Sequence, residues 1–216
     1  MLNVVCVQTQ NYCGRGAVYV DNLRRQVRQH LKAPHRFYVL TDDAASNYPR
    51  MLVKPAVYRG WWEKLRIFKP GMFREGRVLF LDLDTVIVGD ISHLADYQGH
   101  MAMPHDFWNP KGLGPAVMLF DPEWAAFIYE EWAANGFPMD DPRGDQAWIE
   151  NRNQGRMRTE VDIVQDLWPG QFHSYKTSCT NGIPEGARVI CFHGKPRPHQ
   201  VTTGWVPEIW KEPVYG

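Results

Sequence analysis

The sequence predicts one α/β domain with a mostly parallel central sheet flanked by helices. Short apolar runs alternate with amphipathic stretches, a pattern typical of strands that alternate with helices. The 216 residues suffice for one such domain and are few for two. The chain contains no internal repeat, low-complexity segment or Gly/Ser-rich linker. We therefore expect residues 1–216 to form a single domain.

The first part of the chain predicts three strands and two helices. The strands are short apolar runs, and Val20, Leu23, Val27 and Leu31 recur at the spacing of a helix that buries one face. A second, short helix ends at a Lys-Pro-Gly sequence, because the residue before a proline disfavours the helical backbone. In order, the predicted elements are a strand at residues 4–7, a helix through 20–31, a strand at 36–40, a helix at 61–68 and a strand at 77–81.

The second part predicts further strands and a mostly irregular end. Pro122 stands at a favoured position for a helix start, and the tryptophans Trp124 and Trp132 lie on the apolar face of that helix, so we expect them in the core. Proline and glycine dominate beyond the last strand, which predicts an irregular tail. The predicted elements are strands at residues 101–103 and 116–120, a helix from 122, a helix at 144–153, a strand at 189–192 and the tail at 201–216.

The charge balance argues against nucleic acid and anionic membranes as partners. The 24 basic residues equal the 24 acidic ones, so any phosphate must be bound locally. No apolar run approaches the roughly 20 residues of a membrane span, and the start of the chain lacks the regions of a signal peptide. The four cysteines have no CxxC spacing, which favours reduced thiols over a zinc site. These features predict a soluble, cytoplasmic protein.

Two acids at the end of the apolar run 77–81 are the main functional signal. Asp82 and Asp84 follow the predicted strand directly, and open α/β sheets bind ligands at the carboxyl ends of their strands. Residues i and i+2 of a regular strand share a face, so both carboxylates could hold one hard divalent cation. A purely structural role is less favoured, because two close acids in an apolar run repel each other and are costly to bury.

At these residues the chain resembles the GT-A glycosyltransferases, and among them glycosyltransferase family 8, the glycogenin and bacterial galactosyltransferase type. The sequence FLDLDTVIVGDI resembles the Asp-x-Asp strand of that family. Three further motifs follow the family's order: Glu63-Lys64-Leu65, Gly144-Asp145-Gln146 and His193-Gly194-Lys195-Pro196. The chain departs from the family at Gly114-Pro115-Ala116, where an Asn-Ser/Ala-Gly turn is usual, and in the short spacing between His193 and Lys195.

The resemblance implies a GT-A-like fold and transfer of a hexose, with retention of configuration, from a nucleotide-sugar donor. The donor would be a UDP-sugar, and the acceptor a glycan, a lipid-linked sugar or a protein. Residues 1–90 would form the nucleotide-binding part and 91–200 the sugar and acceptor part. The implied metal ligands, for Mn²⁺ or Mg²⁺, are Asp82, Asp84 and His193.

The other candidate residues divide between the donor's three parts. The loop that follows the first strand should hold the base and ribose through Thr9 and Tyr12. Lys64 and Lys195 add positive charge at the diphosphate, and the motif residues Leu83 and Gly194 flank it. The candidates for contact with the donor sugar are Asp145, Gln146 and Asp106, of which the first two are the catalytic candidates. Tryptophans near loops, which we expect to shape the acceptor cleft, are Trp61, Trp62, Trp108 and Trp205.

Two alternatives remain open at the level of sequence. The Asp82–Val86 sequence also fits a phosphatase of the haloacid dehalogenase type, with Asp82 as nucleophile and Asp84 as acid/base. That signature normally closes the first strand, whereas here at least two strands precede it. The second alternative is a non-catalytic module that binds a nucleotide sugar. For His193 and the two lysines, ordinary surface positions are also compatible with the sequence.

Overall fold

A seven-stranded sheet forms the centre of the computed structural model, which describes residues 1–43, 49–52, 58, 60–151 and 154–211. The strand order is β3-β2-β1-β4-β7-β6-β8, and only β7 runs antiparallel to its neighbours. The mostly parallel sheet is therefore confirmed. The strands are β1 (Leu2–Gln8), β2 (His35–Thr41), β3 (Arg50–Leu52), β4 (Arg77–Leu81), β6 (Met101–Met103), β7 (Val117–Phe120) and β8 (Val161–Ile163).

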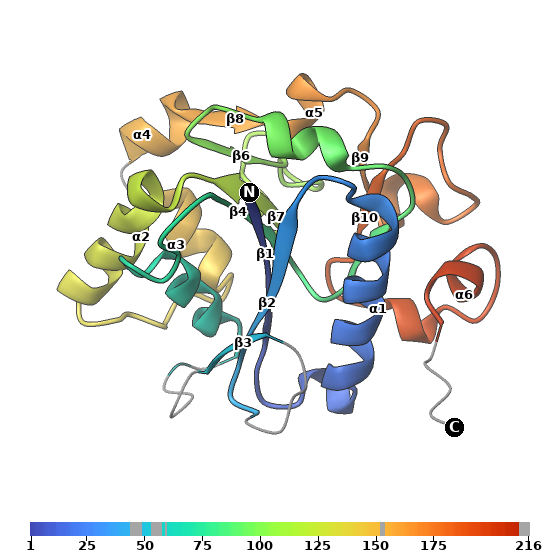
Figure 1. Ribbon diagram of the computed structural model, residues 1–216, viewed down its shortest axis with the longest axis horizontal. Coiled ribbons are helices and arrows are strands. Elements are labelled where there is room, and N and C mark those ends of the chain that lie inside the picture. Colours follow the sequence, from blue (N-terminus) through green and yellow to red (C-terminus); the bar gives the residue numbers. More distant parts are fainter. Residues whose placement is uncertain (44–48, 53–57, 59, 152–153, 212–216) are drawn as a thin grey trace.

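The two faces of this sheet are covered by different helices, as Figure 1 shows. Side chains of β4 alternate: Leu79 and Leu81 pack in the cluster that contains α1 (Gly16–His30), whereas Val78 and Phe80 pack on the opposite side. That opposite face is covered by a 3₁₀ helix, η2, and by α2 and α3. These helices are η2 (Gly60–Phe68), α2 (Pro122–Ala134) and α3 (Asp145–Asn151). Burial on both faces explains why β4 reads as a continuous apolar run.

A second sheet of three short strands was not predicted. Its order is β5-β10-β9, with β5 (Thr85–Ile87), β9 (Phe172–Ser174) and β10 (Val189–Cys191). β5 begins directly after the two aspartates and pairs antiparallel with β10. The backbone N–H of Phe192 donates to the carbonyl oxygen of Asp84 at 3.3 Å. This pairing brings the residues that follow β10 to the end of β4.

The remaining described elements are short. The end of the chain is more ordered than predicted, because Val206 and Trp210 are buried and the rings of Trp210 and Tyr19 lie 5.0 Å apart. Residues 212–216 of the predicted tail and 152–153 of the predicted helix lie outside the described residues. The short elements are η1 (Tyr12–Gly14), η3 (Ser92–Asp96), α4 (Gln154–Thr159), α5 (Val164–Leu167), η4 (Tyr175–Cys179), η5 (Pro198–Gln200) and α6 (Val206–Ile209).

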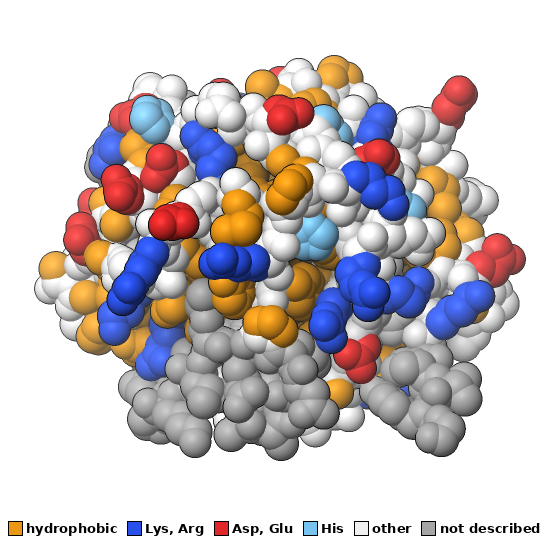
Figure 2. All heavy atoms as spheres, in the orientation of Figure 1, with side chains coloured by type: hydrophobic (Ala, Val, Ile, Leu, Met, Phe, Trp, Pro, Cys, Tyr) orange, Lys and Arg blue, Asp and Glu red, His pale blue; other side chains and the backbone are white. Residues whose placement is uncertain are grey.

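The distribution of charge on the surface and the lengths of the helices agree with what the composition predicts. Basic and acidic side chains are both scattered over the face shown in Figure 2. No helix within the described part of the chain is long and apolar enough to cross a membrane. All four cysteines are free thiols, and only Cys13 is exposed. The expected core positions also hold for Trp132, which is fully buried, while Trp124 is partly buried against the same cluster.

Candidate active site

A cleft of about 570 Å³ lies at the carboxyl ends of β1 and β4. The chain leaves β1 toward β2 and β3 on one side and reaches β4 on the other, so the strand order reverses at this point. Such reversals leave a crevice between the loops of neighbouring strands, where open α/β sheets bind ligands. The residues that line the cleft include Thr9, Tyr12, Trp61, Lys64, Asp82, Leu83, Asp84, Asp106, Trp108, Arg143, Asp145, Gln146, His193 and Arg197.

Every residue that the sequence analysis selected for donor or metal binding lines this cleft except Lys195. Lys195 is exposed, and Arg197 lines the cleft two residues further on. Of the tryptophans expected at the acceptor, Trp61 and Trp108 line the cleft. Trp62 is buried in the core, and the Trp205 indole packs elsewhere and donates to the Cys179 carbonyl at 2.8 Å.

The two aspartates lie in a turn, which corrects the expectation of a regular strand. β4 ends at Leu81, and the N–H of Thr85 donates to the carbonyl oxygen of Asp82 at 3.0 Å. The N–H of Asp82 donates to the carbonyl oxygen of Ala116 at 2.8 Å. The turn is therefore anchored to the loop before β7, and both carboxylates still reach the cleft.

Lys64 links the turn to the start of α3. Its Nζ lies 3.0 Å from Asp82 Oδ1 and 2.8 Å from Asp145 Oδ2, and it donates to the Pro115 carbonyl at 3.3 Å. The side chains of Lys64 and Asp145 are 9% and 7% exposed, whereas that of Asp82 is 31% exposed. Burial alone would lower the pKa of Lys64, but Asp145 and Asp82 outweigh it and raise the pKa. Lys64 is therefore a permanent cation in the cleft.

Arg197 plays the same part at the other aspartate. Its Nη1 lies 2.7 Å from Asp84 Oδ2 and also contacts the Tyr12 hydroxyl. The guanidinium carbon lies 4.7 Å from the centroid of the Tyr12 ring, in a cation–π arrangement. Arg197 was not among the predicted site residues, although its place directly after the late His-Gly-Lys-Pro motif is a signal that could have identified it.

The charged forms of Asp82 and Asp84 are disfavoured despite these cations. Burial raises the pKa of Asp82 to about 6, and Asp145 adds to the rise while Lys64 opposes it. Burial also raises the pKa of Asp84, and the repulsion from Asp82 adds to it. Both shifts mean that the ionised acids would gain from further positive charge, because the charged forms are disfavoured where they stand.

His193 reaches the same cleft but does not join the two aspartates in one ligand group. Trp108 Nε1 donates to its Nδ1 at 3.1 Å, which leaves the proton on Nε2, 2.6 Å from Ser174 Oγ. Burial lowers the pKa of His193, and Lys176 lowers it further, so the ring is neutral at neutral pH. Within the described residues, no three His, Cys, Asp or Glu side chains are grouped to hold a metal ion.

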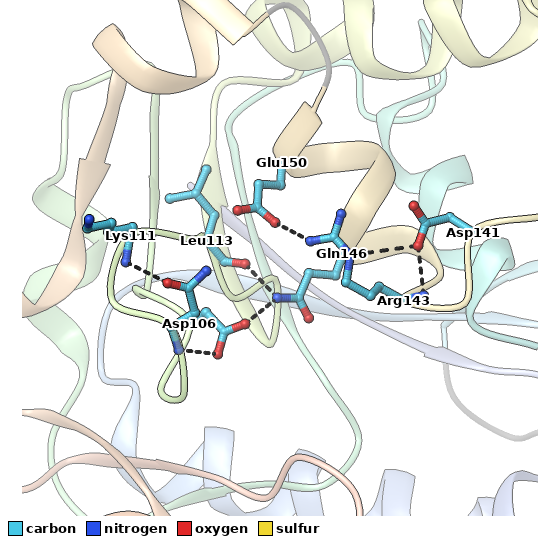
Figure 3. Close-up of polar contacts among 8 residues, drawn as sticks. Asp106, Lys111, Leu113, Asp141, Arg143, Gln146 and Glu150 are labelled. Atoms are coloured by element: carbon cyan, nitrogen blue, oxygen red, sulfur yellow. Dashed lines mark hydrogen bonds and ion pairs between the residues drawn. The ribbon is translucent and has the colours of Figure 1, made fainter.

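Gln146 is held at the wall of the cleft by Asp106. Figure 3 shows the Gln146 amide pointing toward Asp106 and Leu113, with Nε2 2.7 Å from Asp106 Oδ2 and 3.0 Å from the Leu113 carbonyl. The other Asp106 oxygen accepts from the N–H of Trp108 at 2.8 Å. Arg143, beside Gln146, pairs with Glu150 at 3.0 Å. Gln146 Oε1 has no hydrogen-bond partner within the described part of the chain.

Two exposed indoles form part of the cleft wall. Trp61 and Trp108 are 60% and 64% exposed, which is unusual for large aromatic side chains. A Cβ atom at Gly144 would lie 1.9 Å from the Nε1 of Trp61, so the indole occupies the space that the glycine leaves. Trp108 is fixed by its hydrogen bond to His193. Both rings are therefore placed by specific contacts and present apolar surface to the cleft.

The structure is similar to those of solved glycosyltransferases. It matches the galactosyltransferase LgtC, solved in complex with donor and acceptor sugar analogs, with a TM-score of 0.67 and 14% identity over 96% of this chain and 95% of LgtC. GlyE of Streptococcus pneumoniae matches with a TM-score of 0.65 and 13% identity over 96% of this chain and 58% of GlyE. The bifunctional glycosyltransferase WbbM matches with a TM-score of 0.65 and 14% identity over 98% of this chain and 51% of WbbM.

The chain thus spans nearly all of LgtC but little more than half of GlyE and WbbM. No protein-family model matches the sequence. No curated protein matches it either. At this level of identity the similarity establishes the fold, which is that of the GT-A-like glycosyltransferases and confirms the predicted fold class. Membership of family 8 stays a prediction.

Proposed function

We propose that this protein is a glycosyltransferase that moves a hexose from a nucleotide-sugar donor to an acceptor. The observation that carries the proposal is the cleft at the carboxyl ends of β1 and β4. Four separate parts of the chain meet there on a GT-A-like fold. They contribute the acids Asp82 and Asp84, the cations Lys64 and Arg197, and the pair Asp145–Gln146. Reaction in the cytoplasm, and the division near residue 90 into nucleotide and sugar parts, belong to the same proposal.

The donor's diphosphate fits the positive side of the cleft. Lys64 and Arg197 supply positive charge beside the Asp82–Asp84 turn, and the ionised phosphates would pair with them as charge-assisted hydrogen-bond acceptors. Thr9 and Tyr12 line the part of the cleft that follows β1, where we place the base and ribose. We propose UDP as the nucleotide on the family resemblance.

The carboxylates of Asp82 and Asp84 also fit a divalent cation. Burial raises the pKa of both, with repulsion from Asp145 adding to the rise at Asp82 and repulsion from Asp82 adding to it at Asp84, and oxygen donors of this kind suit Mg²⁺ or Mn²⁺. His193, whose ring nitrogens both have partners, would have to turn from Ser174 or Trp108 to add a third ligand. When bound, such an ion neutralises charge that develops on the leaving diphosphate.

Asp145 and Gln146 are the proposed contacts to the transferred sugar. The first residue of α3 is Asp145, whose carboxylate is fixed by Lys64. Asp106 and the Leu113 carbonyl fix the Gln146 amide nitrogen, which leaves Oε1 to accept from a sugar hydroxyl or to face the reacting carbon. Retention of anomeric configuration is proposed on the family 8 resemblance alone.

A thermal-shift measurement tests the donor proposal directly. UDP at a hundred times its dissociation constant should stabilise the fold by about 2.7 kcal/mol, which corresponds to a rise of about 5–11 °C in Tm. We expect this rise with Mn²⁺ and a much smaller one with EDTA. Inorganic phosphate with Mn²⁺ is the control and should produce no comparable shift. Equal shifts for phosphate and UDP would contradict a nucleotide site and would favour the phosphatase alternative.

The exposed indoles provide a prediction about the acceptor side. Trp61→Ala should raise the KM for a saccharide acceptor about three- to tenfold, the size expected for one aromatic stacking contact. Lactose and maltose are suitable acceptors, and the rate of transfer to each is measured as the rate of UDP release. Hydrolysis of the donor in the absence of acceptor should change little, because Trp61 forms no hydrogen bond with Asp82 or Asp84.

The matched control for this variant is Leu167→Ala, since Leu167 is 41% exposed and lies outside the cleft. It should leave the acceptor KM unchanged. If Trp61→Ala lowers donor hydrolysis and acceptor use equally, the indole belongs to the donor site and its acceptor role is wrong.

A further inference from the structure

Arg197 uses only part of its hydrogen-bonding capacity in the contacts that hold it. One nitrogen, Nη1, serves both Asp84 and the Tyr12 hydroxyl. Within the described residues, Nε and Nη2 have no hydrogen-bond partner. A guanidinium carries five N–H donors in a planar fork. The rest of the fork is therefore available to an anion in the cleft that Arg197 lines.

One oxygen of the nearly buried Asp84 carboxylate is already paired with a cation. Its side chain is 10% exposed, and its Oδ2 lies 2.7 Å from Arg197 Nη1. A divalent ion on the same carboxylate would stand within a few ångströms of the guanidinium, and two cations at that distance repel strongly away from water. Metal binding at Asp84 and the Arg197–Asp84 ion pair are therefore in competition.

We propose that Arg197 alternates between two anions: it neutralises Asp84 in the absence of ligand and binds the donor diphosphate once a divalent cation has taken Asp84. Tyr12 keeps the guanidinium in the cleft in both arrangements, because the guanidinium carbon lies 4.7 Å from the centroid of the Tyr12 ring and this contact does not involve Asp84. The second arrangement rests on the proposed function; the competition at Asp84 does not.

This alternation has two consequences of opposite sign. Without nucleotide, Arg197 weakens metal binding, because the metal must displace it from Asp84. With nucleotide, Arg197 strengthens binding, because it contributes a bidentate charge-assisted contact to the phosphates. A residue that merely supports the local structure would change both affinities in the same direction.

Two affinities measured on the intact protein test the proposal. The first is Mn²⁺ binding without nucleotide, followed by the electron paramagnetic resonance signal of free Mn²⁺. The second is UDP binding by calorimetry in excess Mn²⁺. For Arg197→Gln we expect Mn²⁺ to bind about tenfold more tightly and UDP about tenfold more weakly, the size of one charge-assisted hydrogen bond.

Two more variants separate charge from shape. Arg197→Lys keeps the charge but loses the fork, so Mn²⁺ affinity should stay near that of the unmodified protein while UDP affinity falls. Arg74→Gln removes an exposed arginine outside the cleft and should change neither affinity. Melting temperatures of all variants check that each one folds.

The outcomes are distinguishable. If Arg197→Gln lowers both affinities together, or leaves Mn²⁺ binding unchanged, the competition at Asp84 is wrong. If no variant binds Mn²⁺, it is equally wrong. If the unmodified protein binds Mn²⁺ but not UDP, the proposed function fails and the alternation fails with it, while tighter Mn²⁺ binding by Arg197→Gln would still establish the competition.

Discussion

Replacing Asp84 with asparagine is expected to reduce turnover of a UDP-sugar by about 10²–10³-fold, the usual effect of removing one fixed electrostatic group from an active site. Asparagine keeps the size and most of the shape of the side chain but removes its charge. The substitution removes the anion whose Oδ2 lies 2.7 Å from Arg197 Nη1, and it also removes one of the two carboxylates proposed for the divalent ion. The measurement is the rate of UDP release from UDP-glucose with Mn²⁺, with and without acceptor.

Asp90→Asn is the matched control for this prediction. Asp90 lies six residues further along the same segment, outside the cleft, where it accepts from the N–H of Ser92 at 2.7 Å. We expect its turnover to stay near that of the unmodified protein. A similar loss in both variants would mean that the effect comes from the fold, and turnover in Asp84→Asn within about threefold of normal would remove Asp84 from the mechanism.

The fate of Asp82 during turnover, rather than the loss in Asp84→Asn, separates the two enzyme classes considered from the sequence, because both classes use Asp84. A haloacid dehalogenase-type phosphatase would use Asp82 as a covalent nucleophile. In the structure, Asp82 follows the fourth strand in chain order, and its Oδ1 is paired with Lys64 at 3.0 Å. Release of UDP from a UDP-sugar without formation of an acyl-phosphate at Asp82 is therefore the result that the geometry favours.

The sequence predicts the centre of this fold well because its strands are buried on both faces. β4 is an uninterrupted apolar run that stops at an acid, so its end and the site beside it are both visible in the sequence. The strands β5, β8 and β9 have three residues each and were not predicted, whereas β6 and β10 are as short but are wholly apolar. β8 and β9 contain an aspartate and a histidine, and β5 follows the two aspartates directly, so no apolar run marks these three strands. The second sheet is consequently a product of long-range pairing that local patterns do not encode.

The site residues divide in the same way. Asp82, Asp84, Lys64 and Asp145 belong to recognisable local motifs, and the structure brings all four to the cleft. Arg197 meets Asp84 across 113 positions of sequence, after the pairing of β5 with β10 has brought the two segments together. The hydrogen bonds of His193 to Ser174 and Trp108 are likewise tertiary contacts, so its orientation could not be predicted from the motif that contains it.

Lys64→Met is expected to have the largest effect on stability. The substitution leaves Asp82 and Asp145 without the cation that lies within 3.0 Å of each, and removing one partner of a buried ion pair costs about 3–5 kcal/mol. The measurement is the free energy of unfolding in urea. The control is Lys69→Met, at an exposed lysine just after the same helix, which should change stability by less than about 0.5 kcal/mol.

A second substitution identifies which carboxylate causes the loss. The Asp145 side chain is 7% exposed and that of Asp82 is 31% exposed, so water already screens Asp82 and an unpaired Asp145 is the more costly of the two. Lys64→Met combined with Asp145→Asn should therefore recover more stability than Lys64→Met combined with Asp82→Asn. Equal recovery, or none, would mean that Lys64 contributes through packing against Phe80, 5.1 Å from its Nζ, rather than by joining the turn to α3.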